Sequence, residues 1–414
     1  MKDQILANLE DAFQLETLYR SDKSGFKRAF AAIYPQIKDN RLATFWDARL
    51  NFAKEEIAWG NTKELVLMIA ASLLAGVIAK LPAILGIDEE FFYTRNIGFI
   101  VFPILTAYFA WKNKLSIKSI AFIIVLILAG LIFINSLPNV RNADTIVLSC
   151  IHLVIFLWFI LGFSFVGDTT NNVEKRLGYL KFNGDLIVMT TLILIAGGIL
   201  SALTVGLFRL IGMNIEKFYF EYVVIFGLAA APIVGTYLTQ NNPQLVSKVS
   251  PVIAKIFSPL VLVMLVAYLV AIVYSGKDPY NDREFLLIFN ALYIGVLALI
   301  FFSVAETSGV RKNKGEIWVL FLLSLVSVVI NGIALSAIVF RISSWGISAN
   351  RAAVLGANIL ILINLVLVAV KLFQVILRKR DLTDARRMIA FYLPVYFAWA
   401  IIVTFFFPFI FGIR

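Results

Sequence analysis

The stretch SIAFIIVLILAGLIFINSL, residues 119–137, is nineteen residues long and contains no charged side chain. A helix of about 20 apolar residues is long enough to span the ~30 Å hydrocarbon core of a bilayer. In lipid the backbone has to satisfy its own hydrogen bonds, so a spanning stretch of this composition is helical. The stretch therefore predicts a transmembrane helix.

Long apolar stretches recur along the rest of the chain. Hydrophobic residues make up 60% of the 414 residues and charged residues only 15%, whereas a soluble domain is nearer half apolar and a quarter charged. We predict an all-α fold, a polytopic bundle of about eleven transmembrane helices. The predicted spans are 64–85, 97–111, 119–137, 145–167, 185–208, 220–240, 256–275, 284–305, 317–340, 352–377 and 390–412.

The positions of lysine and arginine orient these spans. With the N-terminus inside, 26 of the 37 basic residues fall in inner segments and 9 in outer ones, while Lys80 and Lys371 lie within spans. Basic residues close to span ends favour the cytoplasmic side. We expect the N-terminus in the cytoplasm and the C-terminus outside. The net charge of +11 is then a topology signal, and it does not indicate a nucleic-acid surface.

Residues 1–63 differ from the rest of the chain, residues 64–414, in being mostly polar. Apolar residues recur there at helical spacing, for example Leu9 and Phe13, and Phe26 and Phe30. We expect a small cytoplasmic region of two or three amphipathic helices that lie on the membrane or on the bundle. Residues 64–414 form the predicted transmembrane domain.

The chain has one cysteine, Cys150, and one histidine, His152. A single cysteine excludes an intramolecular disulfide, and the pair argues against a zinc or haem site. We predict no cofactor, no metal ligand and no catalytic residue. Membrane lipid is the expected partner, while a small-molecule or protein partner and the oligomeric state are left open.

Two neighbouring predicted spans carry small residues every four positions. Gly198, Ala202 and Gly206 lie in one, and Gly227, Ala231 and Gly235 lie in the other. Small residues at this spacing let helices approach closely in lipid, so we expect a close antiparallel pair. Pro232 adds either a simple kink or a broken helix that lines a substrate path.

Two predicted outer loops mix charged, aromatic and turn residues. The arginines of the second loop have the planar donor fork that binds anionic groups, and the acidic residues of the first loop are equally suitable partners for them. The loops therefore fit either a ligand site or ion-paired loop structure. The candidate ligand-binding residues are Asp278, Tyr280, Asp282, Arg283, Glu284, Arg341, Trp345, Asn350 and Arg351.

Several polar side chains lie within predicted spans. Ionisable groups in a bilayer are costly and usually face the bundle interior, and long lysine side chains near a span end reach back to the interface. Asparagines bridge helices more often than they bind substrate. The intramembrane polar residues are Lys80, His152, Asn290, Asn331, Asn358, Asn364 and Lys371.

One acidic cluster, Asp88, Glu89 and Glu90, lies in the first predicted outer loop. Membrane glycosyltransferases that use lipid-phosphate sugar donors often have an acidic pair in this position. The loop is only about a dozen residues long, and acids beside a span end are usually just solvated, so the sequence does not favour an enzyme.

The chain resembles a family of bacterial polytopic membrane proteins catalogued as domain of unknown function 4153. The resemblance is carried by GKDPYNDREFLLIFN at 276–290, ALSAIVFRISSWGISANRAAVLG at 334–356 and FYLPVYFAWAIIVTFFFPFIFG at 391–412, with similar stretches at 184–200 and 222–246. It implies a multi-pass protein of the bacterial inner membrane and brings no activity or substrate.

We favour a transporter or permease-like protein of unknown substrate, because the chain combines many predicted spans, small-residue helices, buried asparagines and a polar outer mouth. A membrane scaffold or envelope-assembly protein that transports nothing is the alternative. The predicted spans lack an acidic residue well away from a span end, which weakens a proton-coupled mechanism.

Overall fold

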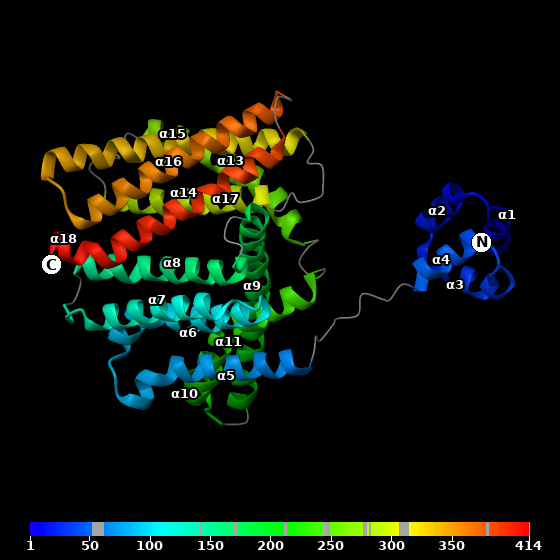
Figure 1. Ribbon diagram of the computed structural model, residues 1–414, viewed down its shortest axis with the longest axis horizontal. Helices are drawn as coiled ribbons and strands as arrows, with labels where there is room; N and C mark the ends of the chain where they lie inside the picture. The colour runs from blue at the N-terminus through cyan, green and yellow to red at the C-terminus, as the bar shows by residue number, and fades with distance from the viewer. Residues whose placement is uncertain are drawn as a thin grey trace. The chain divides into compact units, whose positions relative to one another are not determined.

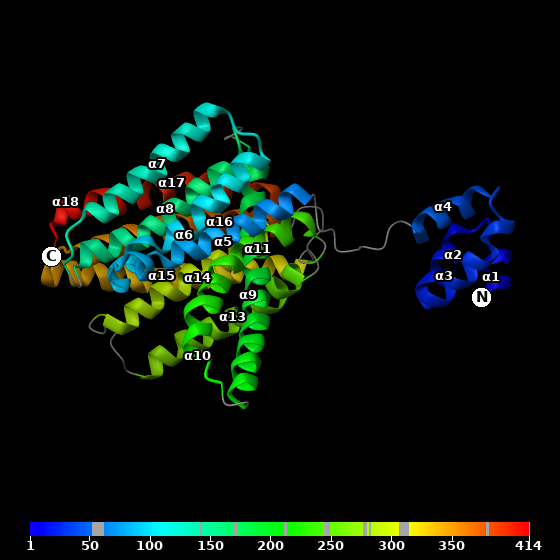
Figure 2. The ribbon, with the colours of Figure 1, turned by 90° about the horizontal axis from the view of Figure 1, so that it is seen from below.

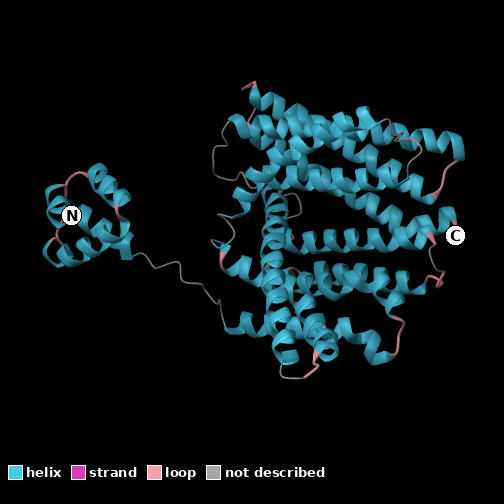
Figure 3. Ribbon diagram, turned by 180° about the vertical axis from the view of Figure 1, so that it is seen from behind, coloured by secondary structure: helices cyan, strands magenta, loops and turns pink. Residues whose placement is uncertain are grey.

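The computed structural model describes residues 1–51, 62–140, 143–168, 172–210, 213–243, 245, 249–275, 280, 283–305, 314–377 and 381–413. Within these residues the regular structure is entirely helical (Figure 3). The chain divides into two compact units, Met1–Trp59 and Gly60–Arg414. The expectation of an all-helical chain is therefore confirmed for the described part.

The first unit is a small helical domain with its own core. It contains α1 (Lys2–Ala7), α2 (Ala12–Ser21), α3 (Lys23–Ile33), the 3₁₀ turn η1 (Tyr34–Gln36) and α4 (Arg41–Asn51). Phe26, Phe30 and Trp46 are almost fully buried in that core, and the rings of Phe26 and Trp46 lie 5.0 Å apart. Most apolar side chains of these helices therefore cover one another, while Phe13 and Phe45 are exposed, and contact with the membrane or the bundle stays a prediction.

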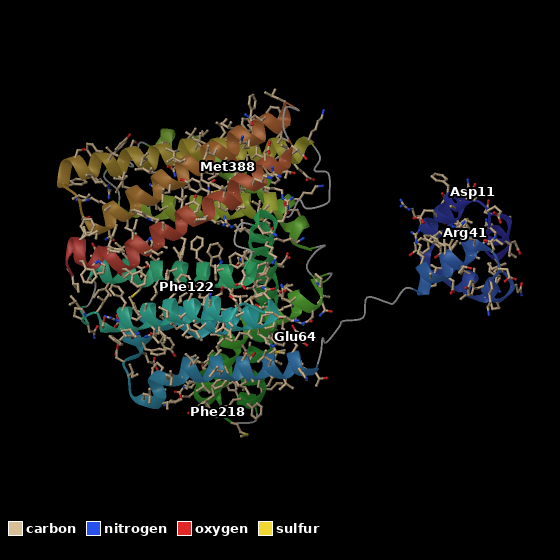
Figure 4. The ribbon with its side chains drawn as sticks, viewed as in Figure 1. Asp11, Arg41, Glu64, Phe122, Phe218 and Met388 are labelled. Carbon is tan, nitrogen blue, oxygen red and sulfur yellow. The ribbon has the colours of Figure 1, made fainter. Side chains whose placement is uncertain are left out.

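Helices α2 and α4 run parallel in this unit. Their N-terminal ends are joined by a hydrogen bond of 2.8 Å from the Asn40 side chain to Glu10, and their later turns by an ion pair of 2.8 Å between Arg49 and Glu16. Asp11 caps α2 by accepting hydrogen bonds from two backbone amides of its first turn. The two ends lie side by side in Figure 4, where Asp11 and Arg41 are labelled.

The second unit is a bundle of long helices (Figure 1). Its elements are α5 (Thr62–Leu85), α6 (Glu89–Lys112), α7 (Ile117–Ser136), α8 (Asp144–Val166), α9 (Val173–Leu210), α10 (Glu216–Phe218), the π-helical turn η2 (Tyr219–Val224), α11 (Ile225–Asn241), α13 (Val249–Ser275), α14 (Arg283–Ala305), α15 (Lys314–Trp345), α16 (Ala349–Ile376), α17 (Leu382–Ile401), the π-helical turn η3 (Ile402–Phe406) and α18 (Phe407–Phe411).

Eight helical segments among the described residues are long and apolar enough to cross a membrane. They cover α5, α7, α8, α9, α10 to α11, α15, α16 and α17 to α18. Helices α6, α13 and α14 coincide with the other three predicted spans. These observations fit an integral membrane protein, while the number eleven and the orientation of the termini stay predictions.

Helix α6 begins eight residues earlier than the span expected at 97–111, at Glu89. Its N-cap is Asp88, whose carboxylate accepts a hydrogen bond of 2.8 Å from the amide of Phe91. Arg95 and Asn96, which the sequence places in a loop, are therefore inside a helix, and both are buried. The span predicted from hydropathy is too short because the charged residues in the first turns of α6 lower the local mean hydropathy.

Hydrogen bonds place the helix ends at two opposite sides of the bundle. Asn113 beyond α6 donates to the Phe165 carbonyl of α8, and the Asp168 carboxylate after α8 accepts a hydrogen bond of 2.9 Å from the amide of Ser116, which caps α7. At the opposite side the Thr145 hydroxyl of α8 donates to the Gly412 carbonyl. We call the side on which α5 begins the proximal end and the other the distal end.

Helix α9 runs across the direction of the other long helices in both Figure 1 and Figure 2. Its first half packs on the bundle, where a Cβ on Gly184 would meet the Phe302 ring of α14 at 2.0 Å. Its second half is largely exposed, with Leu200 and Leu207 each 62% exposed. Residues 185–208 therefore stay among the eight segments long and apolar enough to cross a membrane, in a helix that runs in a different direction from its neighbours (Figure 1).

Helices α9 and α11 pack on each other as expected, but most glycines of their small-residue stripes do not form the contact. A Cβ built on Gly198, Gly206 or Gly227 would meet nothing within 4 Å. Close approach of α9 and α11 occurs instead at Gly235, whose Cβ would lie 2.9 Å from the Thr190 hydroxyl. Helix α11 also continues through the proline at 232, so that proline does not break it.

A second proline has a specific partner. Pro394 in α17 has no N–H, so the carbonyl four residues earlier, that of Ala390, is left without a helical donor. Arg176 of α9 donates to this carbonyl at 3.2 Å. The ion pair of 2.9 Å between Arg386 and Glu174 lies one turn away and adds a second link between α9 and α17.

Candidate functional site

A cavity of about 630 Å³ lies between α5, α6 and α11. It is open on one side, because Leu67, Leu74 and Trp111 on its rim are 40%, 52% and 55% exposed. Its walls are almost entirely apolar. They are formed by Leu67, Met68, Ala70, Ala71, Leu74, Ile78, Phe99, Pro103, Ile104, Leu105, Ala107, Tyr108, Trp111, Ile233, Thr236 and Tyr237.

The amino-acid sequence explains why this space is unfilled. Ala70 and Ala71 on α5 and Ala107 on α6 present small side chains toward it, and Pro103 lies inside α6. The cavity extends along α5 from Leu67 to Ile78, eleven residues or roughly 17 Å at the α-helical rise. Half of a ~30 Å hydrocarbon core is ~15 Å, so the cavity is about as long as one lipid leaflet.

A polar cluster closes the proximal end of the cavity. The Tyr108 hydroxyl donates to the Glu64 carboxylate at 2.7 Å and accepts a hydrogen bond of 3.1 Å from the Lys112 ammonium. Lys112 also donates to the side-chain oxygen of Gln240 at 3.3 Å. We call Glu64, Tyr108, Lys112 and Gln240 the proximal cluster. Figure 4 labels Glu64 at this end of the bundle.

The two charges of the proximal cluster are only loosely paired. The Lys112 ammonium lies 3.8 Å from the nearest Glu64 oxygen, near the limit of an ion pair, and their side chains are 32% and 14% exposed. A carboxylate has about four acceptor positions and an ammonium three donors, so both groups retain capacity for a further partner. The ring of Trp111 lies 6.3 Å from that of Tyr108, as expected of an aromatic belt at a membrane interface.

The structure brings four of the predicted outer-loop residues together at the distal end. Arg341 donates to the Tyr280 carbonyl at 2.8 Å, and Arg351 donates to the carbonyls of Trp345 and Gly346 at 2.9 and 2.8 Å. Both guanidinium groups lie within 6 Å of the Trp345 ring, at 5.9 and 5.7 Å. Arg351 thus satisfies the carbonyl of the last residue of α15 and that of the residue after it, which is a structural role.

The remaining outer-loop candidates add little. Asn350 is half-buried in the first turn of α16. Asp278, Asp282 and the side chains of Arg283 and Glu284 lie outside the described residues. The described part of the two loops forms a cation–aromatic cluster, and the ligand site that the sequence allows at this position stays a prediction.

The two lysines and the histidine within predicted spans differ in their surroundings. Lys80 is buried, and its ammonium lies 4.6 Å from the centre of the Tyr222 ring of η2, a cation–π contact. The His152 ring makes a local hydrogen bond of 2.9 Å with the carbonyl of Leu148. Lys371 is half-buried on α16. None of the three lines the cavity.

Buried asparagines lie on α15 and α16. Asn331, Asn358 and Asn364 are at most 1% exposed, and Asn290 on α14 is half-buried. Asn364 donates to the Tyr396 hydroxyl of α17 at 2.9 Å, whereas neither side-chain atom of Asn331 has a partner among the described residues. These amides lie in helix contacts and line no part of the cavity between α5, α6 and α11.

The acidic cluster after α5 is not gathered into a site. Asp88 caps α6, and Glu89 and Glu90 are exposed in the first turn of that helix, where the helix dipole stabilises acidic side chains. Among the described residues there is no group of three His, Cys, Asp or Glu side chains that could hold a metal ion.

No family model, curated protein or solved structure matches this chain. Membership of the family suggested by the sequence therefore stays a prediction.

Sequence reasoning missed the proximal cluster and Arg95. Glu64, Tyr108 and Lys112 look like ordinary span-end residues, and only the packing of α5 against α6 brings them together. Arg95 is buried and donates to the carbonyls of Leu137 and Pro138 at 3.0 and 2.9 Å. The available signal was a charged residue amid apolar neighbours, which usually marks a buried role in a membrane protein.

Proposed function

We propose that this protein is an integral membrane protein that binds an amphipathic lipid between α5, α6 and α11. One observation carries the proposal, namely a one-sided apolar cavity with a polar cluster at its proximal end. An acyl chain would occupy the cavity and a headgroup would lie at Glu64 and Lys112. The opening between α5 and α6 faces the surrounding lipid, so a lipid could enter sideways.

This proposal narrows the permease-like function that the sequence favours. A path for a hydrophilic solute would be lined by polar side chains, but the walls of the cavity are apolar. The buried asparagines lie elsewhere, in contacts of α15 and α16. An amphiphile is the class of ligand that matches both the apolar walls and the polar end. Residence in a bacterial inner membrane, with the proximal end in the cytoplasm, is part of the proposal.

The test is to fill the cavity. Ala71→Trp places a large ring among the lining residues, whereas Ala202→Trp makes the same change at an exposed position on α9. Lipid that co-purifies with the protein would be counted by native mass spectrometry. We expect Ala71→Trp to lose one bound lipid and Ala202→Trp to retain it. Equal lipid occupancy in the two variants, each still folded by thermal melting, would refute the proposal.

A scaffold role is the second candidate, because the first unit has its own core and two exposed aromatic rings. Phe13 on α2 and Phe45 on α4 are 78% and 58% exposed on two helices that run in parallel. Exposed aromatic side chains are typical of protein-binding surfaces. Deleting residues 1–59 should then remove the cellular phenotype without changing lipid occupancy, whereas a lipid-binding role predicts that the bundle alone retains function.

A further inference from the structure

We propose that the proximal cluster recognises a headgroup that combines a phosphate with a primary ammonium, the chemistry of phosphatidylethanolamine. This inference rests on the proposed lipid binding. It assigns the phosphate to the Lys112 ammonium and the headgroup ammonium to the Glu64 carboxylate. The Tyr108 hydroxyl lies between them and orients both.

The charges of the proximal cluster match a zwitterionic headgroup. The cluster has one formal positive and one formal negative side chain, so its sum is zero. A zwitterionic headgroup matches both charges, and its two ends would replace one loose contact of 3.8 Å with two closer ones. A headgroup with only a phosphate would satisfy Lys112 and place its negative charge close to Glu64, which is unfavourable.

The hydrogen-bonding capacity of Glu64 favours a primary ammonium. A primary ammonium has three N–H donors, and Glu64 is an acceptor with a side chain only 14% exposed. The quaternary ammonium of phosphatidylcholine has no N–H, so it would leave acceptor positions of this carboxylate unpaired. Unpaired buried polar groups are costly, and a site built to hydrogen-bond a ligand therefore discriminates strongly against analogues that lack the donor.

The proximal cluster lies where a lipid headgroup is expected. Glu64 lies in the first turn of α5 and Lys112 is the last residue of α6, so both charges are at the end of the helices. Trp111, next to Lys112, is 55% exposed at the same level. Headgroups lie at this interface, and the apolar cavity begins directly beside it at Leu67. A single lipid could thus place its headgroup at the proximal cluster and its acyl chain in the cavity at the same time.

The experiment is a lipid competition. Delipidated protein is mixed with phosphatidylethanolamine, phosphatidylcholine or phosphatidylglycerol of identical acyl chains, and bound lipid is counted by native mass spectrometry. We expect phosphatidylethanolamine to bind about tenfold more tightly than either competitor, which corresponds to about 1.4 kcal/mol. Soluble glycerophosphoethanolamine should not compete at equal concentration, since it lacks the chain that fills the cavity.

Variants of the cluster locate the selectivity. Glu64→Gln should lose the preference over phosphatidylcholine, and Lys112→Gln should bind all three phospholipids more weakly. Lys118→Gln, an exposed lysine on the first turn of α7, is the matched control and should behave as the wild type. Because one remaining charge could impair folding, the double change Glu64→Gln with Lys112→Gln keeps the cluster neutral and should bind without headgroup preference.

The outcomes separate the two proposals. If all three lipids bind equally and Ala71→Trp blocks them all, lipid binding stands and the headgroup assignment is wrong. If Ala71→Trp blocks none of them, the cavity is not the lipid site and both proposals fail. A preference for phosphatidylethanolamine that survives in Glu64→Gln would also overturn the assignment. Competition by glycerophosphoethanolamine would show that the cluster binds the free headgroup, and would contradict the role given to the cavity.

Discussion

Arg95 links α6 to the end of α7, and replacing it with leucine should destabilise the bundle. The guanidinium donates to the carbonyls of Ile134, Leu137 and Pro138, which lie in the last turn of α7 and just beyond its end. The Ile134 carbonyl has no helical donor because residue 138 is a proline, while the Pro138 carbonyl also accepts a hydrogen bond of 3.0 Å from the amide of Val140. The Phe91 ring lies 4.4 Å from the same guanidinium. Arginine therefore acts as a cap supplied by a neighbouring helix.

The burial of these carbonyls sets the expected loss of stability in Arg95→Leu. Ile134 and Leu137 are buried, whereas Pro138 is exposed, so water can replace the third hydrogen bond. An unsatisfied buried polar group costs about 1–3 kcal/mol, which gives about 2–6 kcal/mol for two carbonyls. Removing the buried charge also removes its own desolvation cost. We therefore expect Arg95→Leu to lower the free energy of unfolding by about 2–5 kcal/mol, and Arg95→Lys, with fewer donors, to lose less.

The assay is reversible unfolding in mixed micelles of lipid and detergent. Arg209→Leu, which removes an exposed arginine near the end of α9, is the matched control and should change stability by less than about 0.5 kcal/mol. An Arg95→Leu variant as stable as the Arg209→Leu variant would refute the capping role.

Three other predictions concern packing, burial and pH. Gly184→Ala should destabilise the bundle because its Cβ would meet a phenylalanine ring on α14 at 2.0 Å. Gly198→Ala, in open space, should be neutral or stabilise α9 by up to about 1 kcal/mol. Equal melting temperatures of the two variants would contradict this. Asn331→Leu should raise stability by about 1–3 kcal/mol, because it removes two buried atoms that have no partner among the described residues, and a loss of stability would imply a bound partner. Hydrogen bonds from the Ser119 hydroxyl and the Ser116 amide lower the pKa of Asp168 below its ordinary 3.8, so its link to α7 should be intact above about pH 4 and lost as the pH falls through the lowered pKa. Amide protection at Ser116, corrected for intrinsic exchange, should show that loss in the wild type but not in Asp168→Asn.

Much of the fold could be predicted from periodicity and charge alone. Each predicted span coincides with a long helix or helical segment, because apolar stretches of this length have no other stable structure in lipid. Hydropathy could not give the direction of α9, because its leucines would suit a helix aligned with the other long helices as well as one that runs across them. The early start of α6 was hidden for a related reason, namely that Arg95 is satisfied by carbonyls from a distant part of the sequence.

The candidate site was less accessible. The sequence singled out Arg341 and Arg351 because charged, aromatic and turn residues are mixed there, and in the structure both arginines donate to carbonyls beside Trp345. The proximal cluster has no such pattern, since Glu64 and Lys112 are 48 residues apart and each resembles a solvated span end. Only the packing of three helices reveals that small side chains on α5 and α6 leave a cavity beside them.

Photo-crosslinking with a phospholipid that carries a diazirine midway along its acyl chain tests the central claim most directly. The protein in vesicles of this lipid would be irradiated, digested and mapped by mass spectrometry. We predict label concentrated on the α5 and α6 residues that line the cavity, such as Ala71, Leu74 and Pro103, and its loss in Ala71→Trp. Label spread evenly over exposed residues of α9, with no enrichment in the cavity and no change in Ala71→Trp, would contradict the account.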